Sequence, residues 1–218
     1  MRKTRALRGL FGALLLVSFP GLAAASPITF TYQVTVTSFD GIVSNALPGL
    51  AVGDVLTGQY TFDDGTPDTN PGAQFGRFDL VAPGQTVVSS IDVEGHTLRW
   101  TGSRIETFDG GVDFYRFQNL GTFLDEPAIG AATFLGQVVG PASLLNGTGL
   151  PATPPDLALA TLNQFMLFIE TQQGDGNIFG TISSFTAGPV AAVPEPASLI
   201  LLGSGLSLLA ARLRRTRG

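Results

Sequence analysis

The sequence predicts an all-β protein in which an antiparallel β-sandwich or jelly-roll-like domain lies between two terminal segments of different character. From Ile28 to Thr37, apolar residues alternate with threonine or glutamine, a period of two that is typical of a strand with one buried face. Turn-forming pairs such as Asp40-Gly41, Asp64-Gly65 and Glu94-Gly95 separate further runs of this kind. A third observation is that no stretch of the domain has convincing helical periodicity.

The first 25 residues have the three regions of a secretory signal peptide. Four basic residues lie within the first eight positions, and the apolar run 10–17 and several small residues follow. Signal peptidase accepts small side chains at its cleavage site, so we expect it to cut between Ala25 and Ser26. The apolar run is too short for a membrane span of ~20 residues, which favours cleavage over anchoring.

Residues 26–186 form the predicted β domain. Short strands separated by turn signals favour a sandwich or jelly roll. The residues 140–155 are rich in Gly, Pro, Ser, Thr and Asn, and we expect a long surface loop there. The best helical candidate, 156–168, contains poor helix formers, and we expect its second half to be a strand. The expected strands are 28–37, 55–62, 86–93, 97–100, 104–108, 112–118, 133–139, 164–170 and 178–186.

The charge of the chain is distributed unevenly. Sixteen carboxylates against four arginines give residues 26–193 a net charge of −12, whereas both ends of the chain are basic. An acidic, lysine-free domain repels phosphate groups, so we exclude nucleic acid as a partner. The chain has no cysteine, which means that a hydrophobic core without disulfides must hold the domain together. The same absence excludes thiol catalysis and thiolate metal sites.

The last 26 residues combine a rigid break, an apolar run and a basic end. The break is Pro194-Glu195-Pro196, which its two prolines keep extended. The uncharged residues 197–211 rise only ~23 Å as a helix, less than the ~30 Å hydrocarbon core, so we expect a temporary membrane anchor after a linker at 187–192. Arginine is favoured on the cytoplasmic side of a span, and the basic end contains Arg212, Arg214, Arg215 and Arg217.

Together, residues 193–218 resemble the PEP-CTERM sorting signal of exported proteins in Gram-negative bacteria. The resemblance implies that an exosortase recognises Pro194, Glu195 and Pro196 and cuts the chain near them. It also implies that the protein is anchored in the inner membrane before processing and then moves to the cell surface or the extracellular matrix. Proteins with this signal often occur in organisms that make exopolysaccharide, so polysaccharide is an expected partner besides signal peptidase and the exosortase.

The β domain contains few residue patterns that are typical of catalysis, and we expect no enzyme activity. His96 is the only histidine, and the chain has no nucleophile elbow, metalloprotease histidine pair or phosphate-binding glycine loop. A calcium site is the better hypothesis, because calcium binds six to eight hard oxygen ligands and loop carboxylates supply them. The alternative is that these residues only form turns. The candidate ligands are Asp63, Asp64, Asp68 and Asn70, with Asp109 and Asp113 in a second stretch.

Two functions are compatible with these features. The first is a structural or interaction role at the cell surface or in the extracellular matrix, linked to exopolysaccharide or biofilm. The alternative is a carbohydrate-binding, lectin-like module in which Trp100, Tyr115 or Tyr60 stacks on sugar faces. Aromatic residues at alternating strand positions are more often part of a core, so the exposure of these three rings decides whether they can bind sugar.

Overall fold

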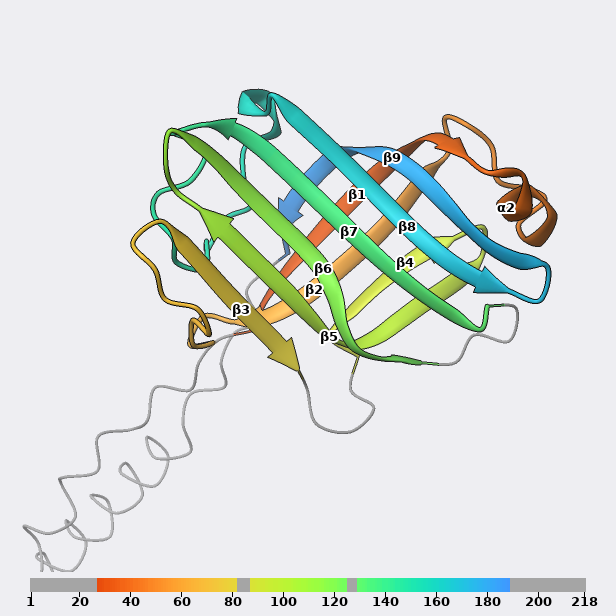
Figure 1. The fold of residues 1–218 in the computed structure, drawn as a ribbon, viewed down its shortest axis with the longest axis horizontal. Helices are drawn as coiled ribbons and strands as arrows, with labels where there is room; N and C mark the ends of the chain where they lie inside the picture. Colours follow the sequence, from red (N-terminus) through yellow and green to blue (C-terminus); the bar gives the residue numbers. More distant parts are fainter. Residues whose placement is uncertain (1–26, 82–86, 125–128, 189–218) are drawn as a thin grey trace, which may run out of the picture. The chain divides into compact units, whose positions relative to one another are not determined.

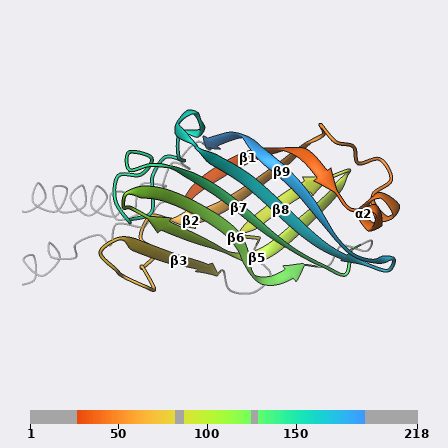
Figure 2. The ribbon, with the colours of Figure 1, turned by 45° about the horizontal axis from the view of Figure 1, so that its top comes forward.

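The computed structural model describes residues 27–81, 87–124 and 129–188, which form an antiparallel β-barrel (Figure 1). Eight strands make the ring, in the order β1–β2–β4–β5–β6–β7–β8–β9. Figure 2 shows the same strands from a second direction, tilted around a common interior. The strands are β1 (Pro27–Phe39), β2 (Val55–Asp63), β3 (Phe75–Val81), β4 (Ser89–Val93), β5 (His96–Phe108), β6 (Val112–Leu124), β7 (Ala131–Pro141), β8 (Leu162–Thr171) and β9 (Gly174–Ala187).

Two pairings close the ring: β5 pairs with β6, and the last strand, β9, pairs with the first, β1. The predicted all-β, antiparallel class is therefore confirmed, but the strands form one closed barrel and not the two packed sheets of a sandwich or jelly roll. Closure pairs the edge strands that an open sheet would leave exposed. Register shifts in β1 at Gln33/Val34 and Val36/Ser38 are irregularities of the kind that bend a strand around a ring.

The strand β3 lies outside the ring of eight and continues the line of β4 along the same side of β5. β4 pairs with residues 96–100 of β5, and β3 pairs with residues 102–108. The sequence analysis missed β3, whose outward positions include the charged residues Arg77 and Asp79 instead of strand-forming residues. It also divided β5 into two strands, because a register shift between Trp100 and Gly102 interrupts the period of two.

Two short helices occur among the described residues; the first lies where no helix was expected, and the second is a single turn at the start of the helical candidate 156–168. The α-helix α2 (Gly41–Ala46) follows β1, and a 3-10 turn, η1 (Leu157–Leu159), precedes β8. Asp40 caps α2, because its side chain accepts a hydrogen bond from the Val43 N–H at 3.2 Å. The Asp40-Gly41 pair was interpreted as a turn, and the same capping chemistry here begins a helix of six residues. Within the parts of the chain that the structure describes, no helix is long and apolar enough to cross a membrane.

The barrel interior is packed with side chains, many of them aromatic. The inward residues of β1 are buried, as the alternation from Ile28 predicted. The Tyr32 ring lies 4.8 Å from the Phe117 ring, and the Tyr60 ring lies 5.1 Å from it, measured between centroids. Gly58 faces this cluster, and a side chain there would overlap the Tyr32 ring. Glycine at this position therefore makes room for an aromatic core, as a small closed barrel requires.

Candidate functional site

The residues predicted to direct export lie outside the described residues. They are the signal cleavage site at Ala25 and Ser26, the sorting motif at Pro194, Glu195 and Pro196, and the arginines Arg212, Arg214, Arg215 and Arg217. The predicted signal peptide, linker end and transmembrane segment lie there too. The described barrel lies within the predicted domain except at its C-terminal end, where β9 continues one residue further, to Ala187.

The aromatic side chains proposed to stack on sugars all point into the barrel. Trp100, Tyr60 and Tyr115 are each 0% exposed, so none of them can contact a carbohydrate in the folded protein. The Trp100 indole N–H donates to the Ala132 carbonyl at 2.8 Å, and the Tyr60 and Tyr115 hydroxyls lie 2.6 Å apart. This part of the carbohydrate hypothesis was wrong: these rings belong to the core because their strand positions face inward.

In the first group of candidate calcium ligands, Asp63 ends β2, and Asp64, Asp68 and Asn70 lie in the loop between β2 and β3. The carboxylates of Asp63 and Asp68 accept hydrogen bonds from backbone groups. Asp63 Oδ1 accepts from the Gly65 N–H at 2.9 Å, and Asp68 Oδ1 accepts from the N–H groups of Asn70 and Arg77 at 2.9 and 3.0 Å. No group of three or more His, Cys, Asp or Glu side chains that could hold a metal occurs among the described residues. The contacts therefore match the turn-forming alternative, and calcium binding stays a prediction.

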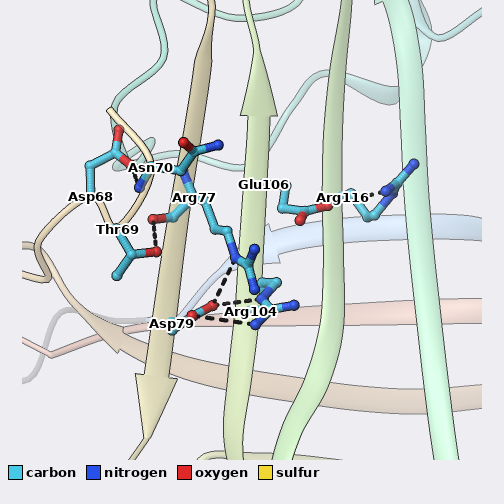
Figure 3. A network of polar contacts seen from close by, with 8 residues as sticks. All are labelled: Asp68, Thr69, Asn70, Arg77, Asp79, Arg104, Glu106 and Arg116. Carbon is cyan, nitrogen blue, oxygen red and sulfur yellow. Dashed lines mark hydrogen bonds and ion pairs between the residues drawn. The ribbon is translucent and has the colours of Figure 1, made fainter. Parts of the chain in front are cut away.

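Ion pairs occupy the outer face of β3, β5 and β6 (Figure 3). Asp79 accepts from both Nε and Nη2 of Arg104, at 2.6 and 3.3 Å, and lies 3.5 Å from Arg77 Nε. The hydrogen bond from Arg104, helped by the charges of both arginines, lowers the pKa of the Asp79 carboxyl below its ordinary value. Glu106 pairs with Arg116 at 3.1 Å. Three of the four arginines in the domain thus lie beside two carboxylates, Asp79 and Glu106, on this face.

Asp113 has a structural role at the end of the barrel where β6 begins. This fully buried carboxylate accepts from the Gly110 N–H through Oδ1 and from the Leu145 N–H through Oδ2, both at 3.0 Å. It therefore ties the turn before β6 to the long connection between β7 and β8. The Thr107 hydroxyl donates to the Thr148 carbonyl at 2.6 Å and fixes the same connection. The predicted loop at 140–155 is present in its greater part, and its first two residues belong to β7.

A shallow groove on the outer wall over β8, β9 and the adjoining edges of β1 and β7 is the best candidate for a binding site. Among the residues that line it are three outward-facing apolar residues that are direct cross-strand neighbours, Leu135, Met166 and Phe179. Met166 is 36% and Phe179 is 42% exposed, and the two lie side by side, whereas singly exposed apolar side chains are common on protein surfaces. The groove is also lined by Thr37, Asn163, Gln164, Phe165, Gly180 and Thr181.

The sequence analysis missed this groove, although a signal for it was present. In a strand with one solvated face, Met166 and Phe179 occupy outward positions where polar residues are expected. A single apolar residue at an outward strand position is common, so neither residue stands out on its own. Only the pairing of β7 with β8 and of β8 with β9 brings the three apolar residues into one row.

The comparison with known protein families identifies one segment of the chain. Residues 192–215 match the PEP-CTERM protein-sorting motif. This match confirms the expected sorting signal and supports export, processing by an exosortase and a final location at the cell surface or outside the cell. No curated protein and no solved structure matches the chain.

Proposed function

We propose that an exosortase sorts this protein to the cell surface or extracellular matrix, where the barrel has a structural or interaction role linked to exopolysaccharide or biofilm. The observation that carries the proposal is the match of residues 192–215 to the sorting motif. The barrel is the part that is delivered, since it lies between the two terminal address segments. We propose no enzymatic activity and no cofactor for it.

The route follows from the order of the segments. Signal peptidase removes residues 1–25, and the uncharged residues 197–211 then hold the chain in the inner membrane, with the arginines on the cytoplasmic side. The anchor is short for a bilayer, which suits a temporary span. Cutting near Pro194-Glu195-Pro196 separates the barrel from this anchor.

The properties of the barrel suit a protein that works outside the cell. Its hydrophobic core contains no cysteine, so folding after export does not depend on forming a disulfide. The net charge of −12 over residues 26–193 disfavours adhesion to anionic membranes and nucleic acids. Both features suit a domain that is exposed outside the cell, and neither identifies its ligand.

Replacing Pro194, Glu195 and Pro196 together by alanine in the native host tests the proposal. We expect the variant to stay in the membrane fraction with its arginine-rich end intact, because the element that the exosortase recognises is gone. Cell fractionation and the intact mass of the product measure both effects. The matched control is Pro189→Ala, which removes a linker proline outside the motif and leaves sorting unchanged. Normal release of the triple variant to the surface contradicts the proposal.

Carbohydrate binding is the second candidate function. Its original support is lost, since Trp100, Tyr60 and Tyr115 are buried. The observation that now favours it is the uncharged groove beside Phe179, where exposed apolar side chains lie next to amide and hydroxyl groups.

A further inference from the structure

Two parallel rows of side chains cross the outer wall of the barrel at β7, β8 and β9. The apolar row is Leu135, Met166 and Phe179. The second row lies two residues along the same strands, roughly 7 Å away, and continues onto β1. It is formed by amide and hydroxyl side chains, with Gln137 opposite Gln164 and Thr181 opposite Thr35. The groove therefore has a strip that excludes water beside a strip that forms hydrogen bonds.

The groove is neutral on an acidic protein. None of the side chains that line it is charged, although the domain carries a net charge of −12. Next to Gln137, on β6, lies Arg116, and its charge is paired with Glu106 at 3.1 Å. A cationic ligand would find no carboxylate in the groove, and an anionic ligand would be repelled by the domain as a whole. The charge distribution thus favours an uncharged ligand.

We propose that this groove binds neutral polysaccharide, with Phe179 as the contact for a sugar face. A sugar ring has an apolar C–H face and a rim of hydroxyl groups, which match the apolar and polar rows respectively. Amide side chains both donate and accept hydrogen bonds, as do threonine hydroxyls, so Gln164 and Thr181 can pair with sugar hydroxyls of either orientation. The inference rests on the proposed function, which places the barrel among exopolysaccharide, and it adds that the polysaccharide is neutral and which side chains contact it.

The size of the apolar row argues against a protein partner. Three neighbouring strands extend over only about 10 Å, whereas a stable protein interface buries about 800 Å² on each side. On one side of the apolar row the next row holds Gln137 and Gln164, and on the other side it holds Thr133, the half-buried Phe168 and Asn177. A linear polymer needs only a narrow strip, because it can gain affinity by engaging several barrels at once.

The test measures retention of the full chain, produced without the exosortase and held in detergent micelles, on three immobilised neutral polysaccharides: dextran, a starch-type glucan and a galactomannan. Alginate is the anionic comparison. We expect retention on at least one neutral polymer and none on alginate. Phe179→Ala should weaken neutral binding roughly tenfold or more, and Phe179→Trp should preserve it. The matched control is Val52→Ala, which removes an exposed apolar side chain outside the groove and should leave binding unchanged.

Three outcomes overturn the inference. They are absence of retention on all three neutral polymers, equal retention of Phe179→Ala and the unchanged chain, and self-association that Phe179→Ala abolishes without any sugar binding. An unchanged thermal unfolding midpoint of Phe179→Ala shows that the variant is folded, as its exposure predicts. The proposed function is judged separately by location: a chain that is sorted normally but binds no sugar overturns only this inference, and a chain that is never sorted contradicts the proposed function.

Discussion

At the scale of single residues, the buried tyrosines show how strongly the barrel interior differs from water. The three tyrosines of the chain, Tyr32, Tyr60 and Tyr115, are all fully buried. Burial raises the pKa of Tyr32 and Tyr60 well above the ordinary value of 10.0, and it raises the pKa of Tyr115 as well. The Tyr60 and Tyr115 hydroxyls satisfy each other at 2.6 Å, so one hydrogen bond joins β2 to β6 across the core.

These shifts predict how stability depends on alkaline pH. The folded state holds the phenol protons more tightly than the unfolded state, so the stabilisation is complete below pH ~10 and is lost as the pH rises above it. We expect tyrosinate absorbance to appear only together with unfolding, followed in parallel by Trp100 fluorescence. In Tyr60→Phe, the absorbance of the two remaining tyrosinates should likewise appear only together with unfolding. Titration of any tyrosine near pH 10 in a chain with native fluorescence would contradict the burial.

At the scale of elements, a buried carboxylate organises the connection between β7 and β8. Loops of this length in a compact domain are uncommon and need their own contacts to stay ordered. Here Asp113 supplies acceptors for the Gly110 and Leu145 N–H groups, and two residues of the loop itself, Leu144 and Leu145, are buried. The sequence analysis grouped Asp113 with candidate calcium ligands, because a carboxylate in a turn is compatible with both roles.

Substitution of Asp113 distinguishes these roles. Asp113→Ala should lower the free energy of unfolding by about 1–3 kcal/mol, because the buried Leu145 N–H and the part-buried Gly110 N–H lose their acceptor. Asp113→Asn keeps one oxygen acceptor and should cost less. The exposed capping residue Asp156, which accepts from Ala158 N–H, is the control, and Asp156→Ala should cost about 0.5–1 kcal/mol. Denaturant unfolding measures these differences. An effect of Asp113→Ala no larger than that of Asp156→Ala would show that the loop is held by other contacts.

At the scale of the whole molecule, the barrel depends on contacts between the two ends of its sequence. β1 pairs with β9 over Phe30–Phe39, and the Gly188 N–H donates to the Thr29 carbonyl at 2.7 Å. The ring therefore cannot close until its last strand has been made and exported. Pairings of such high sequence separation fold slowly and together.

We therefore expect a single cooperative unfolding transition. Thermal unfolding followed by Trp100 fluorescence and by far-ultraviolet circular dichroism should give coincident curves. Thr31→Pro removes a backbone donor in the middle of β1, a central strand paired with Gln59 and Thr186, and should abolish the transition. Ala152→Pro, in the exposed loop, is the control and should fold normally. Two separated transitions in the unchanged chain would contradict the closed ring as one folding unit.

The predictions made from the sequence agreed best with the structure where they depended on residues that are neighbours along the chain. Alternation identified β1, β2 and β7 to β9 to within about four residues and placed the start of β6, but it ended β6 six residues too early. It succeeds because the side-chain period of a strand is set by its own backbone. It failed at β3, where Arg77 and Asp79 are stabilised on the surface by Arg104 of another strand. It also failed at α2, because Asp-Gly is compatible with a turn and with a helix start, and the Asn177 N–H that binds Asp40 belongs to a distant strand.

Composition, local period and a contiguous motif were sufficient to predict the all-β class, the acidic charge of the domain and the sorting signal at residues 193–218, which the family match at 192–215 confirms. Tertiary structure alone decided that the strands close into a barrel, that Trp100, Tyr60 and Tyr115 are buried, and that Leu135, Met166 and Phe179 meet in one groove. The physical reason is that a period of two shows which residues share a face. Which strands become neighbours, and in which register, depends on the burial energy of the whole ring.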